Sequence, residues 1–524
     1  MGSVRNILFI MCDQLRADYL ACAGHPSIKT PNIDALARRG VRFSRAYAQA
    51  PVCGSSRMSF YTGRYVQSHG ATYNGVPLKI GEPTLGDHMR ELGVSTGLVG
   101  KTHMAADLAG MKRLGLDRSS IQGVLAAECG FEPWERDDGL HPDDFTDPNL
   151  AYNVYLRDQG YDGDNPWHTH ANSGVDEKGE VVSGWYLRNA HLPARVDKAH
   201  SETAYMTNRA MEKIRELAET PWCLHLSYIK PHWPYIAPEP YHNMYTEKDV
   251  MTANRGEKER ENPHPVIEAF MAHEESVNFS DEDKRRHVIP AYMGLITEID
   301  DNIGRLMEFL EEQGRLDDTL IVFTSDHGDY LGDHWLGEKE MFHEESVRIP
   351  MIVCHPGSDC DGTRGSEFET LIEAIDLIPT FIDALGGEAK PHLLEGKSFL
   401  PLLEGDNSSE WRDFVMSEAD YSWRGARLSL QLPPDQARAY MLRTERWKYI
   451  SYDNFRPQLF DLQKDPDELI DLGESDLHKE IRTEMEERLN YWLRHRRNRT
   501  TTSHEEIEKR TDTAQKRGIY FGVW

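Results

Sequence analysis

The sequence predicts an α/β protein with a large mixed, mostly parallel central sheet flanked by helices, and a smaller C-terminal α+β domain with an antiparallel sheet. Short apolar runs alternate with segments of helical period along most of the chain, a pattern typical of parallel sheets. Beyond about residue 410 the apolar segments become strand-like and follow one another closely. We therefore expect one domain over residues 1–409 and a second over residues 410–524.

The candidate strands of the central sheet are five apolar runs, at residues 6–12, 94–100, 221–229, 319–325 and 348–354. The clearest intervening helix covers residues 297–316, and four of its apolar residues share one face: Ile299, Ile303, Leu306 and Leu310. Residues 130–200 show no clear period, and we expect long loops there. Residues 256–286 are highly charged, which predicts an exposed excursion.

The second domain has its own strand and helix patterns. Residues 439–452 and 458–463 are typical of strands in a small antiparallel sheet, and a helix is expected over residues 476–494. The chain then ends in RGIYFGVW, residues 517–524. Because a free terminus is rarely so aromatic, we predict that it packs on this subunit or on a neighbouring one.

Composition excludes several classes of partner. The chain has 59 Lys and Arg against 87 Asp and Glu, a formal net charge of −28. This charge argues against nucleic acid, and an anionic substrate would need a local positive field built into its site. No apolar run approaches the roughly 20 residues that span a bilayer, so no membrane segment is expected. Seven scattered cysteines without zinc-like spacing fit a reducing compartment, so we expect a cytoplasmic protein.

Polar residues gather where the apolar runs end. Asp13 and Gln14 follow the first run, and Asp326 and His327 follow the run 319–325. Because ligands bind at the carboxyl ends of strands in open α/β sheets, we expect these side chains to meet. Two carboxylates, an amide oxygen and an imidazole suit Ca²⁺, Mg²⁺ or Mn²⁺, and the histidine also admits Zn²⁺. Turn formation would explain one such pair, but the two pairs together favour a metal site.

Other polar residues suggest a site for an anion. Fixed positive charge from Arg57, Lys101 and Lys339 near a metal would suit a tetrahedral oxyanion such as sulfate or phosphate. His103 and His232 also follow apolar runs, which makes them candidate general acids or bases. A single histidine is more often structural, and a single lysine is more often a solvated surface charge.

The segment CGSSR raises the question of what Cys53 does. It lies beside small residues at the expected start of a helix whose interior begins near Met58. The positive end of that helix and Arg57 would stabilise negative charge at residue 53. An inert buried cysteine fits such polar neighbours poorly. A thiolate nucleophile is one interpretation, but it is an unusual choice beside an oxygen-ligated metal, so the chemical form of residue 53 stays open at this point.

CGSSR followed by SFYTGR resembles the signature of type I sulfatases in the alkaline phosphatase superfamily, in which the cysteine is oxidised to formylglycine after translation. RNILFIMCDQLRADYL, GKTH, KPHWPY and TSDHGDYLGDH are further similar motifs, in the same order along nearly the whole chain. The resemblance implies an alkaline phosphatase-like fold. It also implies hydrolysis of sulfate monoesters, as in arylsulfatases, with additional activity on phosphonate monoesters and phosphodiesters.

The resemblance further implies a cofactor set and partners. One divalent metal ion, in the first place Ca²⁺ or Mn²⁺, would be bound by the hydrated aldehyde at residue 53 and by four side chains: Asp13, Gln14, Asp326 and His327. A formylglycine-generating enzyme would be needed for maturation. The small-molecule substrate would be a sulfate, phosphonate or phosphate ester. Family resemblance and the aromatic tail together predict a homo-oligomer, either a dimer or a tetramer.

The remaining site residues receive roles from the same resemblance. Arg57 would help to activate the hydrated aldehyde as the nucleophile. Three side chains would hold the anion and help protonate the leaving alcohol: Lys101, His232 and Lys339. Asn74 would contact an anion oxygen, and His103 would deprotonate the remaining hydroxyl so that sulfate leaves and the aldehyde is regenerated.

Two positions differ from the usual sulfatase pattern. Ser55 stands where the motif has proline, and Gln14 replaces a second aspartate. The Gln14 substitution and the GIYFGVW ending are similar to the phosphonate monoester hydrolase and choline sulfatase branches, whereas Lys101 and His103 match sulfatases better. Two alternatives therefore stand beside a sulfatase. One is a phosphonate monoester hydrolase or phosphodiesterase using the same site, and the other is an inactive relative that binds anions with unmodified Cys53.

Overall fold

The computed structural model describes residues 4–142, 146–406 and 410–520. The main sheet has nine strands, eight in the order β10-β2-β9-β8-β1-β7-β3-β4, while β11 pairs with β2. Their bounds are β1 (Asn6–Asp13), β2 (Val41–Tyr47), β3 (Ser95–Gly100), β4 (Glu132–Arg136), β7 (Trp222–Pro231), β8 (Thr319–Ser325), β9 (Arg348–Cys354), β10 (Glu367–Phe368) and β11 (Ile372–Glu373). Strand β9 is antiparallel to both neighbours, and the other pairings are parallel. The predicted fold class is confirmed.

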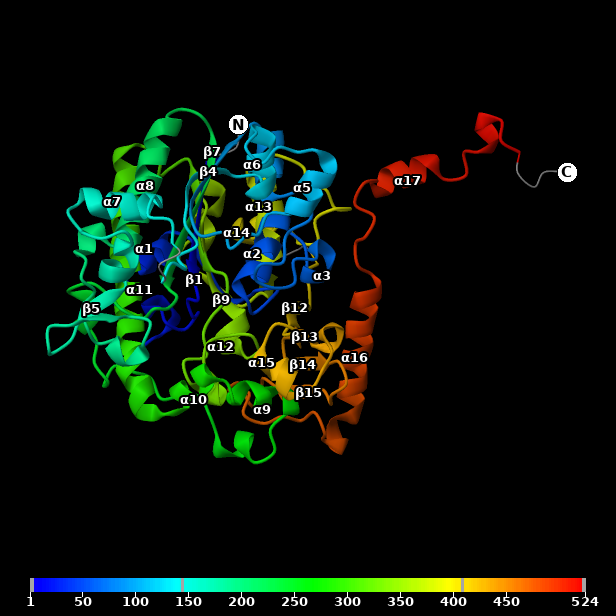
Figure 1. Cartoon of the computed structure of the whole chain (residues 1–524). Helices are drawn as coiled ribbons and strands as arrows, with labels where there is room; N and C mark the ends of the chain where they lie inside the picture. Colours follow the sequence, from blue (N-terminus) through cyan, green and yellow to red (C-terminus); the bar gives the residue numbers. More distant parts are fainter. Residues whose placement is uncertain (1–3, 143–145, 407–409, 521–524) are drawn as a thin grey trace.

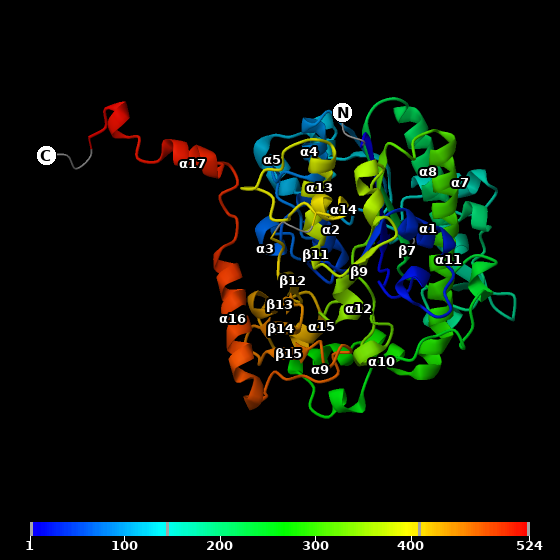
Figure 2. The same cartoon turned by 180° about the vertical axis from the view of Figure 1, so that it is seen from behind.

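Helices cover both faces of this sheet (Figures 1 and 2). One layer contains α1 (Pro31–Arg39), α7 (Ala151–Asp158), α8 (Glu202–Leu217) and α11 (Glu282–Glu312), and the other contains α2 (Cys53–Thr62), α4 (Leu85–Glu91) and α13 (Leu377–Ala384). Along β1, Leu8 and Ile10 pack with the first layer, whereas Ile7 and Phe9 pack with the second. Because both faces are buried, the central strands are continuous apolar runs rather than alternating ones.

The five predicted strands are all present, and four strands of the sheet were not predicted: β2, β4 and the two-residue strands β10 and β11. Strand β2 follows α1 directly, and β4 lies in residues 130–200, where we expected only loops. That expectation is also wrong for α7, which packs Tyr152 and Leu156 into the core. The helix predicted over residues 297–316 is the second half of α11, and its four apolar residues are buried.

A separate antiparallel sheet follows, as predicted. It consists of β12 (Phe414–Asp420), β13 (Arg438–Thr444), β14 (Trp447–Tyr452) and β15 (Gln458–Asp461), paired in that order. Helix α16 (Lys479–Arg494) packs Met485 and Leu489 against one face. Helix α9 (Pro265–Met271) packs Val266 and Phe270 against the other. The expectation of an exposed excursion over residues 256–286 is therefore wrong for α9, since its apolar side is covered by this sheet.

Directly after α16, Arg496 and Arg497 still contact the body of the subunit through Glu418 and Arg64, and the chain beyond them leaves it (Figures 1 and 2). It contains α17 (His504–Arg510), and both Ile519 and Tyr520 are exposed. The described part of the aromatic tail therefore does not pack on its own subunit, while residues 521–524 lie outside the described residues. Packing on a neighbouring subunit stays a prediction. Within the described residues, every helix is too short or too polar to cross a membrane.

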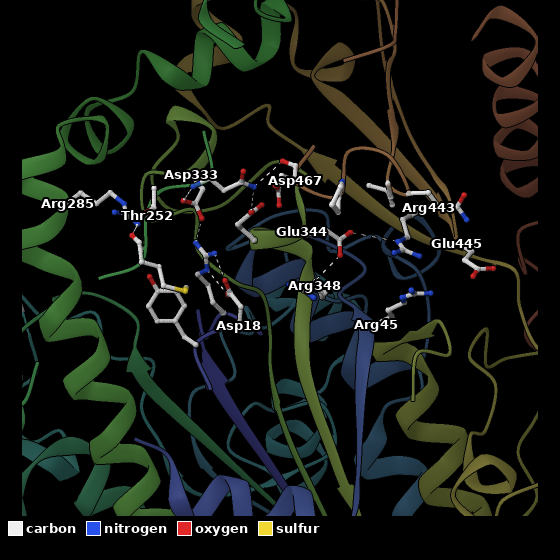
Figure 3. A pocket seen from close by; sticks show the side chains of 18 residues that line it. Asp18, Arg45, Thr252, Arg285, Asp333, Glu344, Arg348, Arg443, Glu445 and Asp467 are labelled. Carbon is white, nitrogen blue, oxygen red and sulfur yellow. Dashed lines mark hydrogen bonds and ion pairs between the residues drawn. The ribbon is translucent and has the colours of Figure 1, made fainter. Parts of the chain in front are cut away.

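A charged cavity of about 620 Å³ lies between the main sheet and the C-terminal sheet (Figure 3). Arg45 of β2, Arg348 of β9 and Arg443 of β13 line it. Glu344 pairs with Arg348 at 3.5 Å and with Arg443 at 3.8 Å, so the cavity wall joins the two sheets by ion pairs. Its lining, drawn from the described part of the chain, includes none of the predicted site residues.

Candidate active site

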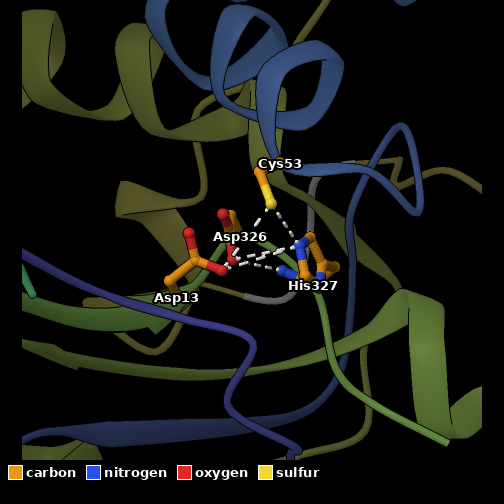
Figure 4. A group of neighbouring side chains, drawn as sticks. All are labelled: Asp13, Cys53, Asp326 and His327. Atoms are coloured by element: carbon orange, nitrogen blue, oxygen red, sulfur yellow. Dashed lines mark hydrogen bonds and ion pairs between the residues drawn. The ribbon is translucent and has the colours of Figure 1, made fainter. Parts of the chain in front are cut away.

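Four side chains converge at the carboxyl edge of the main sheet (Figure 4). Asp13 ends β1, Asp326 and His327 follow β8, and Cys53 is the first residue of α2. One ligand atom from each lies within 4.8 Å of the others, and all four side chains are buried. Cys53 Sγ lies 3.0 Å from His327 Nε2 and 3.7 Å from Asp13 Oδ1. The parallel pairing of β1 with β8 aligns the two strand ends, which brings the predicted metal-binding residues together.

The first turn of α2 holds Cys53 in place. Gly63 ends this helix in the left-handed conformation, with φ 64°. The Gly54 amide donates a hydrogen bond to Asn74 Oδ1 at 2.7 Å. A Cβ atom at residue 54 would lie 2.8 Å from that oxygen, so glycine is what lets Asn74 approach. The positive, N-terminal end of the helix thus lies at the cluster, as the sequence predicted.

The two serines after Gly54 have different partners. The Ser55 hydroxyl, at the motif's proline position, donates a hydrogen bond to the Val52 carbonyl at 3.2 Å. The partner of this hydroxyl therefore lies at the start of the same helix. The Ser56 hydroxyl donates to the Asp326 carbonyl at 2.6 Å. Ser56 therefore fixes α2 to the end of β8.

Arg57 is fully buried and pairs with both carboxylates of the cluster. Its Nε donates to Asp326 Oδ2 at 2.8 Å, and Nη2 donates to Asp13 Oδ2 at 3.2 Å. Its Nη1 donates at 2.7 Å to both Ser227 Oγ and the Lys101 carbonyl. The guanidinium therefore orients the two carboxylates, and Ser227 is a supporting residue that the sequence did not predict. Only the pairing of β1 and β3 with β7 reveals it.

Two lysines bring positive charge to the cluster. Lys101 Nζ lies 2.7 Å from Asp13 Oδ2. Lys339 Nζ donates to Gln14 Oε1 at 2.7 Å and lies 3.4 Å from Cys53 Sγ. Both lysines are buried, and both lie in the site that the sequence assigned to an anion. This arrangement is the local positive field that a chain of net charge −28 would need in order to bind an anion.

Gln14 is held by residues that the sequence did not assign to the site. Its amide nitrogen donates to Asp329, and its backbone is left-handed, with φ 65°. Asp329 also accepts a hydrogen bond from Tyr235 at 2.7 Å. These contacts fix the amide so that its oxygen turns to Lys339 and the cluster. Asp329 belongs to the motif TSDHGDYLGDH and Tyr235 to KPHWPY. Their membership of these motifs is the sequence feature that could have identified them as site residues.

His103 and His232 complete the surroundings of Cys53, and both side chains lie within interaction range of its thiol. The backbone N–H of His103 donates to Asp138 Oδ1 at 2.9 Å, so an unpredicted carboxylate fixes this loop. His232 Nδ1 faces the Trp233 carbonyl at 2.7 Å. Because a carbonyl oxygen only accepts, this contact places a proton on Nδ1 and leaves Nε2 for the site. All the predicted site residues are thus brought together.

Charged neighbours favour negative charge at residue 53. Burial opposes ionisation of Cys53, yet Lys339, His327 and Lys101 hold its pKa well below the ordinary value. Burial also opposes the charged form of His327, but the negative groups around it raise its pKa to about 9. The pKa of His232 falls to about 3, first through burial and then through Lys101. His232 is therefore neutral at pH 7.

The cluster fits a divalent cation by its donor chemistry. Asp13 and Asp326 offer carboxylate oxygens, His327 offers a ring nitrogen, and residue 53 completes the converging set. Hard oxygen donors with one imidazole suit the divalent ions that the sequence predicted. The burial of all four residues would keep competing water from the ion.

Comparison with known proteins agrees with this geometry. A family model described as "Sulfatase" matches residues 5–387. The chain belongs to the sulfatase family. A second model, described as "N-sulphoglucosamine sulphohydrolase, C-terminal", matches residues 332–495. The chain is thus a hydrolase of the sulfatase family, in the alkaline phosphatase superfamily.

Individual relatives include sulfatases and phosphonate hydrolases. The "Multifunctional alkaline phosphatase superfamily protein PehA" of Trinickia caryophylli is 32% identical over 513 residues, covering 90% of this chain and 91% of that protein. The "Arylsulfatase" of Clostridium perfringens is 28% identical over 501 residues, covering 91% of each. The solved structure of "Phosphonate monoester hydrolase SpPMH" from Silicibacter pomeroyi has a TM-score of 0.82 and 28% identity, covering 95% of this chain and 98% of that one.

Proposed function

We propose that this sulfatase-family chain hydrolyses sulfate monoesters, aryl esters among them, at residue 53 after its conversion to formylglycine. The observation that supports this most is the arrangement around Cys53. Carboxylates and an imidazole lie on one side of the thiol, and Lys339 approaches it to 3.4 Å. A nucleophile, a metal site and an anion site would therefore share one buried cluster of side chains.

Two groups would supply chemistry that ordinary side chains lack. A divalent cation held by Asp13, Gln14, Asp326, His327 and residue 53 would polarise the ester oxygens and lower the pKa of a hydroxyl at residue 53. The hydrated aldehyde would offer one hydroxyl as the nucleophile and a second as the means of release, which serine and cysteine cannot do. A formylglycine-generating enzyme would be the maturation partner.

The chain's own side chains would bind the anion and move its protons. Lys101 and Lys339 lie next to Asp13 and Cys53, where their charges would hold two sulfate oxygens. Asn74 reaches the same place through its contact with the Gly54 amide. Lys339 and His232 would assist proton transfer to the leaving oxygen, and His103 would accept a proton from the remaining hydroxyl of residue 53.

A phosphonate monoester hydrolase is the second candidate, because SpPMH shares almost the entire fold with this chain. The same site would act on a phosphonate monoester or a phosphodiester, as a side activity or as the main one. Comparing kcat/KM for 4-nitrophenyl sulfate with that for a phenyl phosphonate ester decides between them. We expect the higher value for the sulfate because Lys101 and His103 match the sulfatase pattern. A higher value for the phosphonate would reverse the order.

The test of the proposed nucleophile is the chemical state of residue 53. Mass spectrometry of the peptide over residues 51–57, after coexpression with a formylglycine-generating enzyme, should show an aldehyde in place of the thiol. Cys53→Ala should abolish hydrolysis, while Cys360→Ser, which removes another buried cysteine outside the site, should retain it. An intact thiol without turnover of either ester would favour the inactive anion-binding relative.

A further inference from the structure

The rim of the site includes an exposed tryptophan from the C-terminal part of the chain. Trp423 lies between β12 and the short helix α15 (Gly425–Ser429), and 66% of its surface is exposed. Its ring is nearly parallel to that of Tyr73, with an interplanar angle of 12° and 6.2 Å between centroids. Two aromatic rings that pack side by side and stay partly exposed offer an apolar surface on which a further ring can stack.

Tyr73 places this pair next to residue 53. It directly precedes Asn74, whose side chain accepts a hydrogen bond from the Gly54 amide. The Tyr73 hydroxyl donates to Glu340 Oε1 at 2.9 Å. Glu340 in turn directly follows Lys339, whose Nζ lies 3.4 Å from Cys53 Sγ. Tyr73 is thus the sequence neighbour of Asn74, and its hydroxyl is bonded to the sequence neighbour of Lys339. Because Asn74 and Lys339 both contact the first turn of α2, the Tyr73 side chain lies close to residue 53.

Trp423 is held at this rim by its neighbours on both sides. Arg424 Nε pairs with Glu340 Oε2 at 2.7 Å, and the same guanidinium pairs with Glu275. The carboxylate of Asp420, at the end of β12, accepts a hydrogen bond from Thr72 at 2.7 Å. The segment that presents Trp423 is thus fastened at both ends to loops of the active site, which favours a fixed aromatic platform over a mobile side chain.

We propose that Tyr73 and Trp423 form the platform on which the leaving group of the ester rests, and that they select flat aromatic leaving groups over flexible alkyl ones. This inference rests on the proposed function at residue 53. It gives the C-terminal part of the chain a direct share in substrate selection, through a side chain that approaches the site only in the folded molecule.

The charges near the platform favour an aromatic leaving group over a cationic one. Three carboxylates lie near the platform, and each already has a partner: Glu340 and Glu275 pair with Arg424, and Asp420 accepts a hydrogen bond from Thr72. A cationic leaving group would have to compete with these partners for them. A neutral ring needs only the exposed face of the indole and the edge or face of the phenol.

The test compares the selectivity of each variant with that of the wild type for the same two esters. The intrinsic difference in reactivity between the two leaving groups is the same in every enzyme and therefore cancels. The kcat/KM ratio of 4-nitrophenyl sulfate to hexyl sulfate is measured for the wild type, Trp423→Ala and Trp423→Phe. We expect Trp423→Ala to lower the ratio about 3- to 10-fold, chiefly through a higher KM for the aryl ester, since stacking stabilises bound substrate and transition state alike. Trp423→Phe should restore most of the ratio, and Tyr491→Ala, an exposed aromatic on α16, should leave it unchanged.

Equal losses on the two esters in Trp423→Ala would show a structural role and overturn the proposal, as would an unchanged ratio. A loss confined to choline sulfate, assayed in parallel, would assign the platform to a cationic leaving group instead. If the wild type hydrolyses neither sulfate ester, the proposed function fails. Calorimetric binding of 4-nitrophenyl sulfate and hexyl sulfate to Cys53→Ala, with and without Trp423→Ala, then still decides whether Trp423 selects the ring.

Discussion

Arg57 offers the sharpest test of how the site is held together. Its guanidinium is fully buried and donates to Asp13, Asp326, Ser227 and the Lys101 carbonyl. Replacing it with alanine would leave two buried carboxylates with one fewer cation and two polar groups without their donor. Removing one partner of a buried ion pair costs about 3–5 kcal/mol. For a chain of 524 residues this corresponds to a fall in Tm of about 3–5 °C, taking about 2 cal/mol/K of unfolding entropy per residue.

The assay is calorimetry of the wild type, Arg57→Ala and Arg57→Lys, each as purified and with added Ca²⁺ or Mn²⁺. A cation between Asp13 and Asp326 would offset part of the repulsion, so the Tm deficit of Arg57→Ala should shrink when the ion is added. Arg57→Lys keeps the charge without the forked geometry and should have the smaller deficit. We expect kcat/KM for Arg57→Ala to fall about 10²- to 10³-fold, as for the loss of one preorganised donor. Wild-type Tm and wild-type activity in Arg57→Ala would refute the role assigned to this residue.

Three further predictions concern stability and the metal. Lys448→Met should lower the unfolding free energy by about 3–5 kcal/mol, because the buried groups bonded to this ammonium lose their charged partner. Those groups are Glu344 at 2.9 Å, Glu468 at 2.6 Å and the Phe342 carbonyl at 2.9 Å. Lys464→Met, a matched change at an exposed lysine, should alter the unfolding free energy by less than about 1 kcal/mol. Burial raises the pKa of Glu298 to about 7, so its proton stabilises the fold below about pH 4.5, and that contribution is lost as the pH rises through 7. Three charged groups face it: Lys230, Glu202 and Asp301. In urea titrations, the unfolding free energy of Glu298→Gln should therefore rise by about 3 kcal/mol relative to that of the wild type between pH 5 and pH 8. A difference in unfolding free energy that stays the same over this pH range would contradict the prediction. Dialysis against a chelator should abolish ester hydrolysis and lower Tm, and both should return with Ca²⁺ or Mn²⁺ but not with Na⁺.

Local patterns in the sequence predicted much of this fold. The five central strands are continuous apolar runs, because both faces of each strand are covered by helices. Strand β2 escaped prediction because its sequence, VRFSRAY, alternates apolar and polar residues near one edge of the sheet and follows α1 without a break. Helix α9 has one charged residue, Glu268, but it lies in a highly charged stretch of sequence, and only the C-terminal sheet shows why Val266 and Phe270 are buried.

The site was predictable to the extent that its residues follow strands. Asp13, Asp326 and His327 could be grouped from sequence alone, because parallel strands of one sheet end at the same edge. The sequence by itself thus determined which residue types reach that edge and in which order. The tertiary structure decided what depends on strand order and on packing between distant segments. Ser227 meets Arg57 because β7 lies beside β1, and Trp423 meets Tyr73 because the C-terminal sheet packs against the active-site loops. No local period encodes such pairings, since they arise from contacts between segments far apart in the chain.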